Sequence, residues 1–422
     1  MTYLLFILTG VIISLGFIGS YLFNKKGIPD NLLLIFFGVL LGPVFNLIEP
    51  SGFQNIAPIF SSLALLVILF DGGMNLNLYK VLDESPKAMV LGVLNVIISM
   101  AVVTTFTSIV LGWSIIYGLL LGTIVGGTSS SIVLSLTKKL GAPERIETLL
   151  SLESVFTDAI VVVLSITFLD LITETKNMVV SEIAQSIAST FSIGIVLGLI
   201  FGVIWVKLLS IIRDETYDDI LTLSVTILFY GVTEYVGGNG AIFALIFGLV
   251  LGNSIEVGNM FRMEGLVEVG VIMRKFMNQI SFFIRTYFFV YLGLILFIEN
   301  RNMILYSIIL SILLLVGRYI GVTLTAFKDT ELQNHINVIT FMMPRGLAAA
   351  IMAQLVVTSN IEGASMFPDL ILIIIIASVV ISSLGTALLK RGNPTTGDTS
   401  LENQNHESKE EIQKQDSNSQ SS

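Results

Sequence analysis

Two stretches of sequence, GGTSSS at residues 126–131 and ESVFTD at residues 153–158, decide the fold. The first interrupts an apolar segment with a glycine pair, and the second places Glu153 and Asp158 inside the next apolar segment. A bilayer disfavours both features, since one ionised side chain at mid-membrane costs about 2.5–3.5 kcal/mol or more, and unpaired backbone groups add to that. Together the two stretches indicate a cation site, with Asp158 as its central residue.

The composition is that of a membrane protein. Of 422 residues, 54% are hydrophobic and 13% are charged, and the mean hydropathy is +0.88. Soluble domains carry about 25% charged residues. The chain has no cysteine, and its two histidines, His335 and His406, give no metal-binding constellation. No nucleophile–base pair and no dense basic face are present, so we expect no enzyme, no resident cofactor and no nucleic-acid partner.

Thirteen apolar segments approach the ~20 residues that a helix needs to cross a bilayer. The first is predicted to be a membrane span and not a cleaved signal, because no basic region precedes it. The predicted spans are 3–23, 30–47, 55–79, 88–112, 114–137, 146–172, 183–209, 218–236, 238–255, 277–299, 303–326, 333–357 and 369–389.

The basic residues predict the orientation of these spans. With the N-terminus outside, fifteen Lys and Arg residues fall on one side of the bilayer, and only Lys176 and Arg301 fall on the other. Cytoplasmic loops carry the excess of positive charge. We therefore expect a multi-pass protein of the cell membrane with its N-terminus outside and its C-terminus in the cytoplasm. Residues 391–422 are polar and are predicted to be a disordered cytoplasmic tail.

A second interruption, Pro344-Arg345-Gly346, matches the glycine pair Gly126-Gly127. Counted from the start of two six-span halves, with span 7 between them, the two interruptions occupy the same fifth position. Paired interruptions at equivalent places are typical of inverted repeats, and unwound backbone is tolerated where it lines a cavity. We expect the two breaks to face each other and to offer freed carbonyl groups to cations.

Six ionisable residues lie well inside the predicted spans: Asp71, Glu153, Asp158, Arg285, Arg318 and Arg345. At 100° per residue, Glu153 and Asp158 point about 140° apart, so they cannot share one partner. An arginine keeps its proton and can hold Glu153 in a fixed pair. Asp158 is then left to bind either a proton or an alkali cation, and competition between them is enough for exchange.

Hydroxyl groups near Asp158 are candidate cation ligands. These groups belong to Thr128, Ser129, Ser154 and Thr157, whereas Ser130 and Ser131 are expected to bond their own backbone. Asp71 is either an exposed carboxylate at a helix end or a charge in the funnel that binds the ion through water.

These residues resemble the signature of the monovalent cation:proton antiporters of the NhaP/NHE type. The resemblance covers nearly all of residues 1–390 and rests on GGT (126–128), APERIETLL (142–150), ESVFTDA (153–159), FDGG (70–73), GRYIGV (317–322) and PRGLAAA (344–350). It implies an all-α homodimer of about thirteen transmembrane helices with inverted repeats and two crossed, broken helices.

By the same resemblance, a mobile core comprises residues 88–172 and 303–390, and residues 1–87 and 183–299 form the scaffold and the dimer contact. Asp158 is the carboxylate that binds the ion and the proton, and Ser154 and Thr128 are cation ligands. Glu153 pairs with Arg318, the pattern associated with electroneutral exchange. Asp71 takes the place of an acid that reaches the ion through water, and Arg345 belongs to the second break.

Two departures from the family pattern affect the ion. Thr157 stands where an asparagine is usual, and Thr128-Ser129-Ser130 replaces Thr-Asp-Pro. One-for-one competition at Asp158 survives both changes, but a preference for Na⁺ does not follow.

Arg285 lies where members of the family differ, so the resemblance gives it no role. We expect H⁺ exchange for Na⁺, with Li⁺ or K⁺ as alternatives; the rival interpretations are a K⁺/H⁺ efflux antiporter and a cation channel or sensor.

Overall fold

The structure is a computed structural model that describes residues 2–26, 30–48, 57–76, 78–173, 180–212, 217–262, 271–296, 301–359, 361 and 366–392. All regular structure in these ranges is helical, which confirms the all-α prediction. The predicted disordered tail lies outside the described residues from position 393 onward.

Within the described residues, each predicted span overlaps one helix or an interrupted pair of helices. The helices are α1 (Thr2–Lys26), α2 (Asp30–Val39), α3 (Ala57–Asn75), α4 (Leu78–Phe106), α5 (Ile115–Ile124), α6 (Ser130–Leu140), α7 (Glu144–Thr173), α8 (Val180–Ile211), α9 (Asp218–Tyr235), α10 (Gly240–Gly252), α11 (Ser254–Met260), α12 (Val271–Ile295), α13 (Arg301–Thr325), α14 (Thr330–Asn334), α15 (Ile336–Phe341), α16 (Leu347–Thr358) and α17 (Met366–Gly392). Two π-helical turns, Leu40–Val44 and Thr107–Leu111, extend α2 and α4.

Within the described ranges, five helices are long and apolar enough to cross a membrane on their own, and a sixth is added if α10 and α11, which meet at 85°, count as one span. The five are Pro86–Leu111, Glu144–Thr173, Ala188–Ile211, Arg301–Thr325 and Met366–Lys390. Shorter apolar helices include α5 and α16, which are halves of interrupted segments. The count of thirteen spans stays a prediction.

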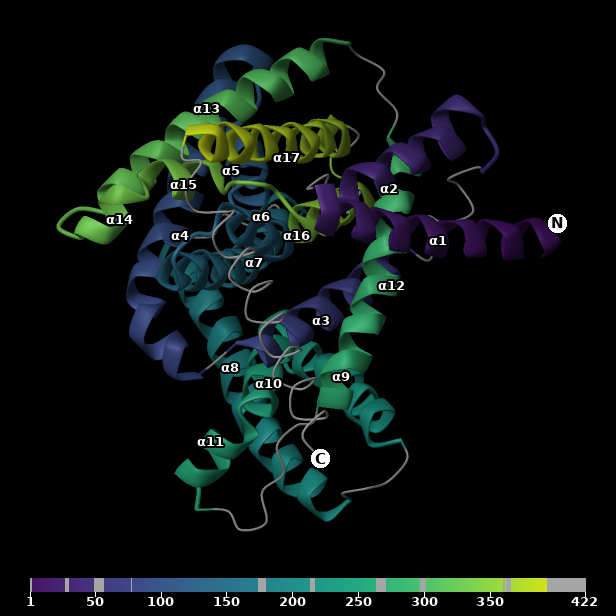
Figure 1. The fold of residues 1–422 in the computed structure, drawn as a ribbon, viewed down its shortest axis with the longest axis vertical. Coiled ribbons are helices and arrows are strands. Elements are labelled where there is room, and N and C mark those ends of the chain that lie inside the picture. The colour runs from purple at the N-terminus through teal and green to yellow at the C-terminus, as the bar shows by residue number, and fades with distance from the viewer. Residues whose placement is uncertain are drawn as a thin grey trace, which may run out of the picture.

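The helices pack in two groups, one in the upper left of Figure 1 and one that occupies its right side and lower part. In one group, α4 packs on α5, α7 and α13, and α17 packs on α13, α15 and α16. In the other, α10 packs on α3, α8 and α9, and α12 packs on α1, α2 and α3. The main contact between the groups is made by α16 with α3. The division of the chain into a mobile core of residues 88–172 and 303–390 and a scaffold of residues 1–87 and 183–299 stays a prediction.

Glycines bring α3 and α10 into backbone contact. A Cβ atom on Gly73 would lie 2.1 Å from the Leu245 carbonyl oxygen, and one on Gly248 would lie 2.2 Å from that of Phe70. Such distances leave no room for a side chain. The close contact fixes the C-terminal part of α3, which carries Asp71, against its neighbours.

Local sequence also sets the position of α7. Gly141 adopts a left-handed conformation (φ 63°) and ends α6, as glycine does at many helix C-termini. The first turn of α7 then begins with Glu144 and Glu147, whose charges favour a helix N-terminus. The helix runs unbroken past Glu153 and Asp158 to Thr173.

Candidate functional site

The two interruptions lie against each other. The amide N–H of Ser129 donates to the carbonyl of Pro344 at 2.8 Å. A Cβ atom on Gly346 would lie 2.6 Å from the Cβ of Ser129, so the two unwound segments touch. The backbone between α5 and α6 is thus paired with the backbone between α15 and α16, which agrees with the expectation that the breaks face each other.

Arg345 occupies the crossing. Its Nη1 donates to the carbonyls of Gly126 (3.1 Å) and Gly127 (2.7 Å), and its amide donates to Ser378 Oγ (2.9 Å). A buried guanidinium requires acceptors, and the C-terminal carbonyls of an interrupted helix provide partial negative charge. This corrects one expectation: the carbonyls of Gly126 and Gly127 are bonded to arginine and are not free for a cation.

Glu153 is locked in a buried network. The Arg318 guanidinium contacts both carboxylate oxygens, with Nη2 at 2.8 Å from Oε2 and Nη1 on Oε1. Asn95 Nδ2 donates to the same Oε1 at 3.0 Å, and Arg318 Nε donates to the carbonyl of Ile339. The Glu153 residue is 0% exposed and Arg318 is 3% exposed. The pair joins α7 to α13 and leaves Glu153 no room to exchange ions.

Three of the predicted ligands form a buried hydroxyl cluster. Thr128 Oγ1 and Ser154 Oγ are hydrogen-bonded at 2.8 Å. Thr157 Oγ1 accepts from the Thr128 amide at 3.3 Å and donates to the Ser154 carbonyl at 3.0 Å. Each of these residues is at most 1% exposed. The cluster fastens the first break to α7.

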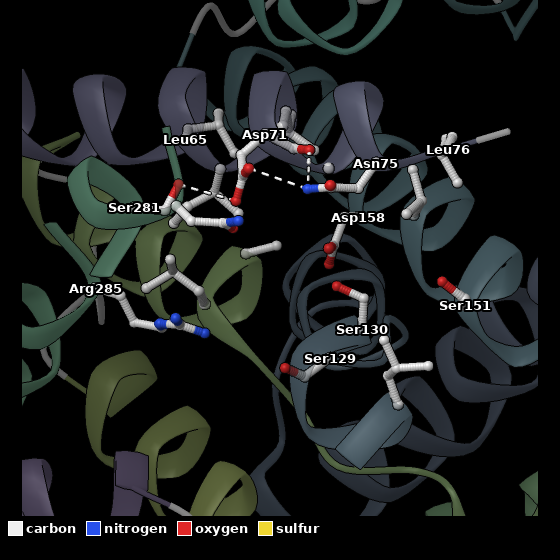
Figure 2. A pocket seen from close by; sticks show the side chains of 18 of the residues that line it. Leu65, Asp71, Asn75, Leu76, Ser129, Ser130, Ser151, Asp158, Ser281 and Arg285 are labelled. Atoms are coloured by element: carbon white, nitrogen blue, oxygen red, sulfur yellow. Dashed lines mark hydrogen bonds between the residues drawn. The ribbon is translucent and has the colours of Figure 1, made fainter. Parts of the chain in front are cut away.

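Asp158 faces a cavity of about 460 Å³ (Figure 2). Its solvent exposure is intermediate, and within the described residues it makes no hydrogen bond or ion pair. Ser129 and Ser130, at the N-terminus of α6, and Leu347, at the N-terminus of α16, line the same cavity. Helix N-termini carry partial positive charge, which suits an anionic group. Asp158 therefore borders a cavity, whereas Glu153 on the same helix is enclosed by protein.

Asp71 lies on the α3 wall of this cavity. Its carboxylate accepts hydrogen bonds from Ser281 Oγ and from Asn75 Nδ2, each at 3.1 Å (Figure 2). Arg285, one turn beyond Ser281 on α12, extends its guanidinium into the cavity. The structure thus gathers Asp71, Asp158 and Arg285 around one space.

Sequence reasoning identified only some of the lining residues. Of the predicted site, Asp71, Ser129 and Asp158 line the cavity, whereas Thr128, Ser154 and Thr157 do not appear in its wall. The polar lining residues that it missed are Asn75, Ser130, Ser151, Asn278 and Ser281. Helical spacing was a usable signal for some of them: Asn75 is four residues after Asp71, and Ser151 is seven residues before Asp158.

An all-α membrane fold in which two interrupted helices meet beside a cavity lined by carboxylates is characteristic of secondary transporters. The chain belongs to the family described as "Sodium/hydrogen exchanger, transmembrane", whose profile matches residues 4–391.

Similar proteins fall into two groups by name. The probable Na⁺/H⁺ antiporter 2 of Methanocaldococcus jannaschii is 28% identical over 368 residues, 84% of each chain. The K⁺/H⁺ antiporter NhaP2 of Shewanella sp. (strain ANA-3) is 30% identical over 258 residues, 59% of this chain. The match covers 44% of that relative, so the chain spans less than half of its length.

The fold is similar to a solved structure. The sodium proton antiporter MjNhaP1 from Methanocaldococcus jannaschii at pH 8 aligns with a TM-score of 0.72, covering 92% of this chain and 97% of that chain. The sequences are 20% identical, so this likeness establishes the fold alone.

Proposed function

We propose that the protein is a secondary antiporter that exchanges H⁺ for a monovalent cation by competition at Asp158. Na⁺ is the first candidate, with Li⁺ and K⁺ as alternatives. The observation that carries the proposal is the contrast between two acids on α7: Glu153 is held by Arg318, while Asp158 is unpaired among the described residues and faces the cavity.

One carboxylate that binds a proton or a cation, but not both, couples the two fluxes. Oxygen ligands suit alkali ions. Ser129 and Ser130 are in the cavity wall with Asp158, and we propose that Thr128, Ser154 and Thr157 complete the ion shell when the site rearranges to hold an ion. The Glu153–Arg318 pair has no net charge and exchanges no ion, so Asp158 alone exchanges one H⁺ for one monovalent cation. The exchange is then electroneutral.

We further propose that the helices of residues 88–172 and 303–390 move as a core past a scaffold of residues 1–87 and 183–299, which alternates access to Asp158. The scaffold would form a homodimer in the cell membrane, with the N-terminus outside. Cross-linking of single cysteines placed on the exposed face of α1, in a chain without native cysteine, tests the dimer. Thiol labelling from each side tests the orientation.

Replacement of Asp158 by asparagine tests the proposal directly. The amide cannot release a proton, so D158N proteoliposomes are expected to lose pH-driven ²²Na⁺ uptake. Asp170→Asn, an exposed position on the same helix, is the matched control and should keep uptake. Uptake by D158N at the wild-type rate, with equal protein incorporation, would exclude Asp158 as the exchange site.

The cation needs a separate measurement, because relatives are named for Na⁺/H⁺ and for K⁺/H⁺ antiport. Proton flux is measured against gradients of Li⁺, Na⁺, K⁺ and Rb⁺ with the voltage clamped. Exchange with K⁺ and not Na⁺ would favour the efflux antiporter. A current that does not saturate and needs no proton gradient would favour a channel.

A further inference from the structure

Arg285 is an arginine of the cavity that the exchange mechanism above does not use. It lies on α12, on the wall opposite Asp158, with its guanidinium directed into the cavity (Figure 2). Among the residues that the structure describes, Arg285 makes no ion pair within 4 Å and no hydrogen bond. A guanidinium beside two carboxylates but bonded to neither acts through its charge, and not through a fixed contact.

Neutral donors already satisfy Asp71. Ser281 Oγ donates to one carboxylate oxygen and Asn75 Nδ2 donates to the other. These bonds hold the carboxylate in place without neutralising it. The nearby guanidinium is then the compensating charge for Asp71, and its freedom from direct pairing leaves it able to turn toward either acid.

The charge of the cavity follows from its lining. The ionisable residues among the described lining residues are Asp71, Asp158 and Arg285. Two carboxylates and one guanidinium leave a single net negative charge in the empty cavity. One proton or one alkali cation on Asp158 makes the cavity neutral. Without Arg285 the empty cavity would carry two negative charges and would attract a first cation more strongly and a second one as well.

We propose that Arg285 is a built-in counter-ion that limits the cavity to one positive guest and lowers its affinity for the transported cation. The inference rests on the proposed antiport function and adds to it a residue that sets cation affinity. A tethered positive charge competes with the incoming cation, so it raises the cation concentration that gives half-maximal exchange. It also speeds release, because a weakly held ion leaves faster.

The test compares the KM for the cation in proteoliposomes at one fixed pH, which is kept the same for all variants. Arg285→Gln is expected to lower the KM by about 3- to 10-fold, the range for one charge removed from a partly hydrated cavity. Arg285→Lys keeps the charge and should keep the wild-type KM, since in the described part of the chain the arginine makes no two-pronged contact that lysine would lose.

Changing Asp71 tests the same idea, because this substitution removes a negative charge from the cavity where Arg285→Gln removes a positive one. Asp71→Asn makes the empty cavity neutral and is expected to raise the KM. The double variant Asp71→Asn/Arg285→Gln restores one net negative charge and should return the KM toward the wild-type value. If Arg285 only supported the structure of α12, these KM values would not follow the net charge of the cavity. Arg285→Lys would then change the KM as Arg285→Gln does, and Asp71→Asn would not restore the KM of Arg285→Gln.

The possible results separate the two claims. If R285Q has a wild-type or higher KM while wild-type protein exchanges cations, the inference about Arg285 is overturned and the antiport proposal stands. If the wild-type protein exchanges no cation for protons, the antiport proposal fails and this inference fails with it. If R285Q does not insert, D71N decides: a KM at or below the wild-type value overturns the inference.

Discussion

The two acids of α7 show how five residues of separation give opposite chemistry. Glu153 points into the interface with α13, where Arg318 and Asn95 bond its oxygens and exclude solvent. Asp158 lies about one and a half turns further along and faces the cavity. The 140° angle between them was predictable from the sequence. The partner of Glu153 was not, because spacing gave no reason to choose Arg318 over Arg285; only the family resemblance named it.

Removal of the Glu153 carboxylate should mainly harm stability. Glu153→Ala leaves Arg318 charged and unpaired in a dry interface, which costs about 3–5 kcal/mol for a buried pair. We expect lower yield and a lower Tm in detergent. A Glu153→Leu/Arg318→Met variant removes both charges and should regain much of the lost Tm. If Glu153→Ala had a normal Tm but no transport, Glu153 and not Asp158 would be the acid that binds the ion.

At the scale of elements, the crossing of the two interrupted segments depends on small side chains and one arginine. Gly-Gly and Pro-Arg-Gly predicted both breaks from the sequence, because the two runs occupy equivalent positions in the two halves of the chain, as in inverted repeats. The residue that pairs with the freed carbonyls was not predictable in the same way. Arg345 reaches Gly126 and Gly127 across more than two hundred residues of sequence, and this contact depends on how the halves pack.

The close approach at Gly346 gives a prediction for this element. Gly346→Ala would place a methyl group 2.6 Å from Ser129 Cβ and 3.1 Å from its Cα, so one unwound segment must shift. We expect a loss of about 1–3 kcal/mol of stability and reduced exchange, because Ser129 is in the cavity wall. The control is Gly231→Ala on α9, where a Cβ has no atom within 4 Å. Equal Tm and uptake in both variants would show that the crossing tolerates a methyl group.

At the scale of the whole molecule, hydropathy located the helices, and the sequence predicted two contacts between them, the crossing of the two breaks and the Glu153–Arg318 pair, whereas the other helix contacts came from the structure. Charged residues near the helix ends join distant parts of the chain. Asp329, in the turn between α13 and α14, accepts hydrogen bonds from Arg145 Nη2 (2.9 Å) and Nη1 (3.3 Å), and it is also contacted by Lys87. Arg145 lies in the first turn of α7 and Lys87 lies on α4, so this one carboxylate joins the turn after α13 to two helices that are far from it in the sequence.

The Asp329 network should make stability depend on acidity. Hydrogen bonds from Arg145 first, and from Lys87 second, hold the pKa of Asp329 well below its usual range. A carboxyl group with a lowered folded-state pKa stabilises the fold above the unfolded value of about 3.9 and loses that effect as the pH falls toward the folded value. Asp329→Asn is therefore expected to lower the Tm by a constant amount from pH 8 to 5, and the difference from wild type should shrink below about pH 4.

The comparison for this prediction is Glu331→Gln, which removes a second partner of Arg145. The Glu331 side chain is 41% exposed, against 11% for Asp329, so solvent screens its ion pair more strongly and its loss should shift the Tm less. Thermal unfolding in detergent across the pH range measures both variants. At low pH, protonation of Asp329 in the wild type should remove the same negative charge that Asp329→Asn removes, so the two Tm values should converge. A Tm difference that grows as the pH falls would contradict the lowered pKa of Asp329.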